Sequence, residues 1–207
     1  MGNRFAELAF TPAVQAQQEA YGSRASYTRF SEGEPWNDRL SSKESEFIAA
    51  RDGFYLASVG ETGWPYVQFR GGAPGFLRVL DERTLAWADF RGNRQYVSVG
   101  NATGNDRVAL ILMDYANRRR LKILGRVEIR KVGADEKLAS RLAVPGYPAV
   151  VERAVLVHVA GFDWNCPQHI TPRFTLDEVE QTTRPLRERV TELEAKLASC
   201  EAQSELR

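Results

Sequence analysis

The stretch Ala88-Asp89-Phe90-Arg91-Gly92-Asn93-Arg94-Gln95-Tyr96 joins an apolar run over residues 85–88, typical of a buried strand, to a short predicted helix over residues 95–100. A glycine, an amide side chain and two guanidinium groups therefore stand where a strand turns into a helix. Backbone N–H groups at a helix N-terminus face anions, and arginine pairs with phosphate oxygens through two parallel hydrogen bonds. The pattern predicts a phosphate-binding turn, with a solvated basic turn as the alternative.

The composition and net charge of the chain limit the classes of protein to which it can belong. With 207 residues, 43% of them hydrophobic, it can build one substantial core. The 28 basic and 27 acidic residues leave a net charge of +1, so nothing favours nucleic acid or membrane as a partner and any anion site must be local. Two cysteines without CxxC spacing and two histidines predict no metal site. Without a long apolar run, the chain is expected to be soluble and cytoplasmic.

Strand and turn signals surround the phosphate-binding turn. Apolar runs separated by short turns predict seven strands, over residues 54–59, 65–70, 76–80, 85–89, 107–113, 121–130 and 154–162. Short connections favour an antiparallel meander over βαβ crossovers, and hence a small closed or split barrel. Helices are expected over residues 12–21, 42–51 and 134–142, with an irregular arm over 23–38. Ser41 and Glu44 form a predicted capping box, and Gly53 is expected to be a left-handed cap.

The end of the chain carries a heptad pattern. Leu186, Val190, Leu193, Leu197, Cys200 and Ser204 are spaced 4-3-4-3-4. This seam is short, so the helix alone is marginal in water. We expect an amphipathic helix that either pairs with its copy in a dimer or packs on the barrel.

Several motifs in one order resemble the pyridoxamine 5′-phosphate oxidase-related, FMN-binding split-barrel family, in particular its uncharacterised bacterial flavoproteins. They are residues 64–72 (WPYVQFRGG), 75–81 (GFLRVLD), the phosphate-binding turn, 118–126 (RRRLKILGR) and 164–170 (WNCPQHI). The resemblance spans about residues 42–173. It implies a mainly β fold with flanking helices (α+β), namely an N-terminal helical arm (1–40), a split-barrel FMN-binding domain (41–175) and a C-terminal helix (176–207). It also implies a homodimer with FMN between the subunits.

The resemblance assigns candidate cofactor-binding residues. The strand that lies along the flavin ring in the family corresponds here to Val67, Gln68, Phe69, Arg70 and Gly71. The phosphate residues fall on Asn93, Arg94 and Gln95, with Ala88 and Asp89 on the strand beneath. A family glutamine that reaches the flavin falls on Arg120.

Residue chemistry supports some of these roles independently of the family. Arg91, Asn93 and Arg94 can hold a phosphate dianion, and Gln68 suits the pyrimidine edge of a flavin. Arg70 or Arg120 can stabilise the reduced anionic ring.

This chain departs from the oxidase proper at two places. Gln95 stands where the oxidase carries a lysine, a loss for which Arg91 can compensate. The C-terminal arginine-and-histidine motif that binds the oxidase's substrate is replaced by residues 165–169, so pyridoxine-phosphate oxidation is not expected. In this loop Gln168 and His169 are the candidate catalytic residues, with a loop that merely covers the barrel edge as the alternative.

The expected function is an FMN-dependent oxidoreductase that passes electrons between a reduced nicotinamide and a small-molecule acceptor. No protein nucleophile is needed, because the cofactor carries the chemistry. The chain has no GxGxxG dinucleotide fingerprint, so NAD(P)H would bind only transiently. A non-catalytic flavin-binding carrier, sensor or interaction module remains the alternative. A third interpretation keeps the barrel and replaces FMN with haem or a deazaflavin.

Overall fold

The computed structural model describes residues 2–28, 36–131, 135–164 and 166–205 and groups them into two compact units. The first unit comprises Met1–Asp114 and Arg119–Gln168. The second comprises Tyr115–Arg118 and His169–Arg207. Asn165, part of the predicted substrate loop, lies outside the described residues, as do parts of the predicted arm and of the helix over 134–142. The division into arm, barrel and C-terminal helix stays a prediction.

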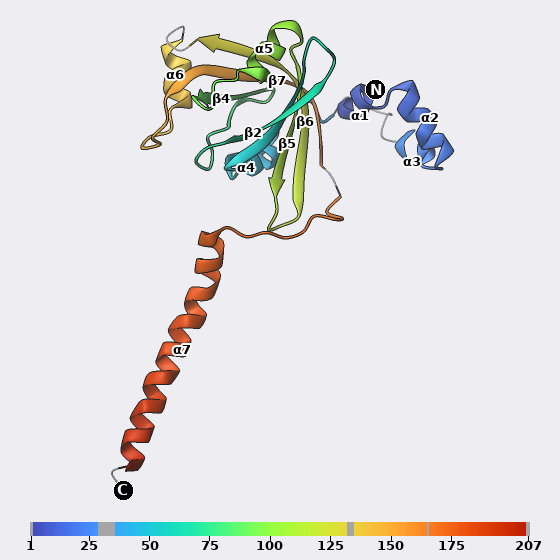
Figure 1. The fold of residues 1–207 in the computed structure, drawn as a ribbon. Helices are drawn as coiled ribbons and strands as arrows, with labels where there is room; N and C mark the ends of the chain where they lie inside the picture. The colour runs from blue at the N-terminus through green and yellow to red at the C-terminus, as the bar shows by residue number, and fades with distance from the viewer. Residues whose placement is uncertain (1, 29–35, 132–134, 165, 206–207) are drawn as a thin grey trace. The chain divides into compact units, whose positions relative to one another are not determined.

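The first unit contains a seven-stranded antiparallel sheet in the order β2-β1-β5-β6-β7-β4-β3 (Figure 1). Its strands are β1 (Gly53–Val59), β2 (Pro65–Gly71), β3 (Arg78–Asp81), β4 (Thr84–Phe90), β5 (Arg107–Asp114), β6 (Arg119–Lys131) and β7 (Val151–Trp164). This order leaves β2 at one edge, yet Arg70 of β2 bonds Asp89 of β4 near the other edge. An ion pair thus bridges the opening where β2 and β4 share no ladder, and the predicted split barrel is confirmed.

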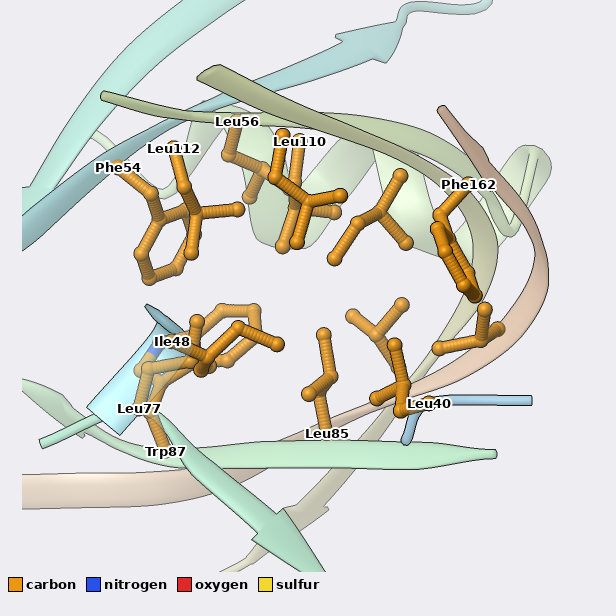
Figure 2. Close-up of a cluster of buried hydrophobic side chains, with 14 of the residues drawn as sticks. Leu40, Ile48, Phe54, Leu56, Leu77, Leu85, Trp87, Leu110, Leu112 and Phe162 are labelled. Atoms are coloured by element: carbon orange, nitrogen blue, oxygen red, sulfur yellow. The ribbon is translucent and has the colours of Figure 1, made fainter. Parts of the chain in front are cut away.

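Side-chain alternation along the strands fills the interior of the barrel. Figure 2 shows Leu56, Leu110 and Leu112 on one side facing Leu85 and other apolar side chains on the opposite side. At one end of the interior, Phe54 stacks on Phe76 with ring centroids 5.8 Å apart and meets Trp87 edge-on at 5.1 Å. The core therefore combines both halves of the split sheet.

Two strand-level predictions are corrected. Gly53 is not a left-handed cap, because it is the first residue of β1 and pairs with Gly71. The preceding helix already ends at Ala50, and a Cβ on Gly53 would lie 2.3 Å from the Phe69 ring, so close side-chain approach requires this glycine. Phe76 is buried as predicted but precedes β3, because its N–H bonds back to Ala73 in a turn that Gly75 enters with φ +78°.

The described helices are α1 (Arg4–Ala9), α2 (Pro12–Ala20), α3 (Arg24–Thr28), α4 (Ser42–Ala49), α5 (Val97–Gly104), α6 (Glu136–Leu142) and α7 (Leu176–Glu205). The sequence analysis missed α1, which Asn3 caps by accepting a bond from the Ala6 N–H at 2.9 Å. It also missed α3, inside the arm predicted as irregular. Helix α5 begins two residues later than predicted, because Tyr96 takes up a left-handed conformation. In the described part of the chain, no helix is both long and apolar enough to cross a membrane.

Glu44 ties helix α4 to the end of β7. Its carboxylate accepts bonds from the Ser41 N–H at 3.1 Å and from the Trp164 indole at 2.7 Å, which confirms the capping box and extends it. Burial opposes ionisation, but the bonds from Ser41 and Trp164 outweigh it and hold the pKa of Glu44 below its ordinary value of 4.5.

Replacing Glu44 should therefore have a pH-dependent effect on stability. A carboxylate whose pKa is lowered by folding stabilises the protein above pH 4.5 and loses that contribution as the pH falls through its folded value. Glu44→Gln should lower the free energy of unfolding by about 1–3 kcal/mol at pH 7, and by much less near pH 3. Urea unfolding at both pH values measures this. Glu46→Gln, an exposed position on the same helix, is the control, and an equal loss for Glu44→Gln at both pH values would contradict the assignment.

Candidate anion-binding site

The connection between β4 and α5 has an unusual backbone. Arg94 and Tyr96 both take up left-handed conformations, with φ of 62° and 57°, although neither is glycine. Gln95 lies between them, and its N–H bonds the Asn93 side chain at 3.2 Å. Such strain persists only where the surroundings enforce it and concentrates at functional sites. Left-handed residues within a turn also help to gather backbone N–H groups into anion-binding concavities.

The arginines of this turn are joined to β7 through Glu152. Arg91 Nε donates to Glu152 at 3.0 Å, and the Tyr96 hydroxyl donates to the same oxygen at 3.2 Å. Arg94 Nε in turn lies 3.4 Å from the Tyr96 hydroxyl. Burial raises the pKa of Glu152, but the bonds from Arg91, Arg153 and Tyr96 hold it below the ordinary value. Glu152 is therefore an ionised anchor for a basic turn.

A second carboxylate, Asp89 at the end of β4, is buried between two guanidinium groups. Arg70 donates to it from β2 at 2.8 Å, and Arg153 Nε approaches it from β7 at 3.1 Å. Burial raises the pKa of Asp89, while the charges of Arg70 and Arg153 oppose that rise. Three strands thus meet at one ion-paired cluster.

The cluster carries an excess of positive charge. Its charged members are four guanidinium groups and two carboxylates, namely Arg70, Arg91, Arg94, Arg153, Asp89 and Glu152. They leave a net charge of two. These residues surround a small hollow beneath the turn and an adjoining one of about 290 Å³. The second hollow is close in size to the smallest typical small-molecule sites, which begin at roughly 300 Å³.

Two buried donors in the cluster have no hydrogen-bond partner among the described residues. They are Nε of Arg70 and Nε of Arg153. Arg153 Nε lies within ion-pair distance of Asp89, but it makes no hydrogen bond there. Unpaired buried donors cost free energy and are rare in folded proteins, so each calls for an explanation. A bound acceptor group would supply one.

The two faces of β2 have different environments. Gln68 and Arg70 pair with the core residues Leu56 and Phe54 and share their inward face. The Gln68 carbonyl accepts a bond from Ser98 of α5 at 3.0 Å, which orients its amide beside the turn. The hollows are therefore lined by Gln68 and Arg70 from one side and by the turn from the other.

Residues 40–160 match the family described as Pyridoxamine 5'-phosphate oxidase, which is more than half of the 207-residue chain. The chain belongs to the pyridoxamine 5′-phosphate oxidase family. A comparison with curated proteins found no match.

Solved structures are similar to this chain at low sequence identity. HupZ from Group A Streptococcus is 16% identical, and the match covers 65% of this chain and 99% of that chain at a TM-score of 0.50. A putative pyridoxamine 5'-phosphate oxidase from Lactobacillus delbrueckii is 20% identical over 61% of this chain and 94% of that one, with a TM-score of 0.47. A FAD-binding protein from Mesorhizobium loti is 17% identical over 60% and 94%, with a TM-score of 0.43. At 16% identity the likeness to HupZ concerns the fold alone.

Most of the cofactor-binding residues predicted from the family lie around the two hollows. The lining includes Gln68, Phe69, Arg70, Gly71, Ala88, Asp89, Arg91, Asn93, Arg94 and Gln95. Two predicted residues do not line them. Val67 is 61% exposed on the outer face of β2, and Arg120 pairs with Met113, which places it on the outer face of β6. A family site shared between subunits would have to reach these two from the outer face, so their roles stay predictions.

The sequence analysis missed Glu152 and Arg153, which complete the cluster. Both stand near the start of β7, about sixty residues after Asp89. The ladder between β4 and β7 sets Arg153 directly opposite Asp89. The one local signal was the adjacent Glu-Arg pair at the beginning of an apolar strand, a position where charged side chains are also common without function.

The candidate catalytic residues stay predictions. Gln168 is exposed and is the last residue of the first unit, and His169 belongs to the second unit and has a left-handed backbone, φ 61°. The other histidine, His158, belongs to β7 and lies 3.1 Å from Glu128, as expected of a sheet histidine with a partner.

Proposed function

We propose that this member of the family binds FMN and uses it as an oxidoreductase, taking electrons from a reduced nicotinamide for a small-molecule acceptor. The observation that supports FMN most directly is the cluster at the β4–α5 turn with its net charge of two. A phosphate monoester carries a charge of about −1.5 to −2 at neutral pH. The charge of the site therefore complements the phosphate of FMN.

The residues around the hollows also fit in kind. Arg91, Arg94 and Arg153 would hold the phosphate, and the amides of Asn93 and Gln95 can add hydrogen bonds. Gln68, with its carbonyl held by Ser98, presents its amide donors to the edge of a ring. The unpartnered Nε groups of Arg70 and Arg153 would gain acceptors. When bound, FMN supplies hydride and single-electron chemistry, while the chain supplies binding, orientation and charge.

We further propose that the working form is a homodimer with the cofactor between subunits. The outer face of β2, β1 and β5 supports this. Val67, Phe69, Tyr55 and Ile111 share that face and are 39–61% exposed. A cluster of large exposed apolar side chains more often belongs to a protein–protein association surface than to a surface that stays in contact with solvent. Val67 and Arg120 would then contact the cofactor at the interface between the two subunits. We expect the dimer to be cytoplasmic.

The rival is a flavin-binding module without turnover. A flavin-binding module would give the purified protein the same absorption spectrum, with bands at about 370 and 450 nm, because the protein only tunes the electronic properties of the cofactor. Steady-state oxidation of NADH or NADPH by the FMN-loaded protein separates the two functions. Absence of oxidation with every acceptor tested would favour the module.

Removing charge from the turn should weaken FMN binding. Arg94→Ala should lower the affinity by about ten- to a hundredfold, the effect expected when a charge-assisted contact is lost. Arg91→Ala should act in the same direction but more weakly, because Arg91 is already paired with Glu152. Titration of the apoprotein with FMN, followed by flavin fluorescence, measures both. Arg126→Ala, which removes an exposed arginine paired with Asp106 away from the turn, is the control. Unchanged affinity in both turn variants would rule out this phosphate site.

His169→Ala tests the substrate loop separately from the cofactor. If the loop meets the substrate, turnover or KM with NAD(P)H should change several-fold while FMN affinity stays the same, because the phosphate is held elsewhere. Gln168→Ala is the companion variant. If both variants keep wild-type kinetics, the loop only covers the barrel edge.

A further inference from the structure

Helix α7 carries a long seam that is exposed and is apolar at every position but one. The seam begins a heptad and a half before the pattern noted in the sequence and comprises Leu176, Val179, Thr183, Leu186, Val190, Leu193 and Leu197. Its leucines and valines are 43–88% exposed. The helix has 30 residues and is therefore about 45 Å long. Helical stability in proteins comes mostly from burying an apolar face, so a seam of this length requires a partner.

The residue types in the seam indicate what that partner is. When Leu176 is assigned to heptad position a, the a positions hold Leu176, Thr183, Val190 and Leu197, and the d positions hold Val179, Leu186 and Leu193. The two central heptads, Thr183 with Leu186 and Val190 with Leu193, combine a β-branched residue at a with leucine at d, which favours two parallel strands over larger bundles. We propose that α7 pairs with α7 of a second copy in a parallel, in-register, two-stranded coiled coil.

The flanking charges support the parallel orientation. In a parallel pair, each g residue faces the e residue five positions later on the partner. Arg189 at g then faces Glu194 of the partner subunit. This contact joins opposite charges.

An antiparallel pair would set g against g and e against e. The charged g residues are Arg189 and Lys196, both cations, so every charged g contact would be repulsive. Within one chain, Glu192 bonds Arg189 at 2.6 Å and Lys196 at 2.5 Å, which holds both cations on the same flank of the helix. Pro185 stands at an outward c position, where it does not interrupt the seam. Charge and shape therefore favour the same arrangement.

A parallel coiled coil has its two-fold axis along the helices, the symmetry of a homodimer. The coiled coil can thus join the same two subunits as the dimer proposed above. The inference depends on α7 alone and not on flavin binding. If FMN does not bind, the coiled coil is still expected, and if the coiled coil does not form, FMN binding is still expected.

Disulfide cross-linking tests the register. The background is the full chain with Cys166→Ser and Cys200→Ser, into which a single cysteine is placed by Leu197→Cys at position a or by Ala195→Cys at the outward position f. A disulfide needs Cβ atoms about 4 Å apart, so Leu197→Cys should cross-link at least about tenfold faster than Ala195→Cys. Equal rates, or no cross-link at position 197, would overturn the coiled coil. Preferential cross-linking of a Thr183→Cys copy to a Leu197→Cys copy would overturn the parallel orientation.

A charge swap tests the flanking pair in the same assay. In the Leu197→Cys background, Glu194→Arg should slow cross-linking several-fold at low salt, because it faces Arg189 of the partner subunit. Adding Arg189→Glu should restore the rate. If Glu194→Arg has no effect, or if the double variant is slower still, the proposed register is wrong. FMN affinity, measured on the same samples, should stay unchanged throughout.

Discussion

Arg153→Ala should reduce FMN affinity by about a hundredfold or more, and it should also destabilise the fold. Arg153 is largely buried and contacts both carboxylates of the cluster, Asp89 and Glu152. Its loss leaves Asp89 with Arg70 as its one cationic partner in the cluster and halves the net positive charge. Removing one member of a buried ion pair typically costs 3–5 kcal/mol, and because Arg70 remains we expect about 3 kcal/mol.

Two further variants separate charge from geometry. Arg153→Lys keeps the charge but loses the planar fork, so it should recover part of the affinity and less of the stability. Arg126→Ala, which breaks the exposed pair with Asp106, should change stability by less than about 1 kcal/mol and leave FMN binding intact. Flavin titration and urea unfolding measure the two quantities. If Arg153→Ala binds FMN as tightly as the wild type, the phosphate does not lie at this cluster.

Phe54→Ala should be the most destabilising substitution in the sheet. Phe54 is 1% exposed and contacts Phe76 and Trp87 where the two halves of the barrel meet. Truncating a buried phenylalanine typically costs about 3–5 kcal/mol through lost burial and the cavity left behind. Urea unfolding of the variant measures this loss.

Phe69→Ala is the matched control from the opposite face. Phe69 is 57% exposed and meets Tyr55 edge-on at 5.4 Å outside the barrel. At low protein concentration it should change stability by about 1 kcal/mol or less. Its effect should instead be a weaker dimer, detected by light scattering across a dilution series. If Phe69→Ala unfolds the protein as readily as Phe54→Ala, the outer face is not the proposed association surface.

Much of the fold was predictable because its signals are local. Apolar runs separated by short turns identified all seven strands, and the Ser41–Glu44 spacing identified the start of α4. These features depend on residues a few positions apart. One error arose where a contact distant in sequence prevailed over a local signal. The sequence predicted that Gly53 caps a helix, but Gly53 pairs with Gly71 across the hairpin and is therefore the first residue of β1.

The sequence by itself determined the seven strands, the family motifs and the basic turn from Arg91 to Arg94. Apolar runs and turn-forming residues are signals that depend only on residues close together in the chain. Tertiary structure alone decided which side chains stand around that turn. The register of β4 against β7 sets Arg153 opposite Asp89, and closure of the split sheet brings Arg70 to the same carboxylate. A one-residue slip in that register would turn Arg153 to the other face of the sheet. The physical reason is that pairing between distant strands is selected by burial of the whole core, which no single segment encodes.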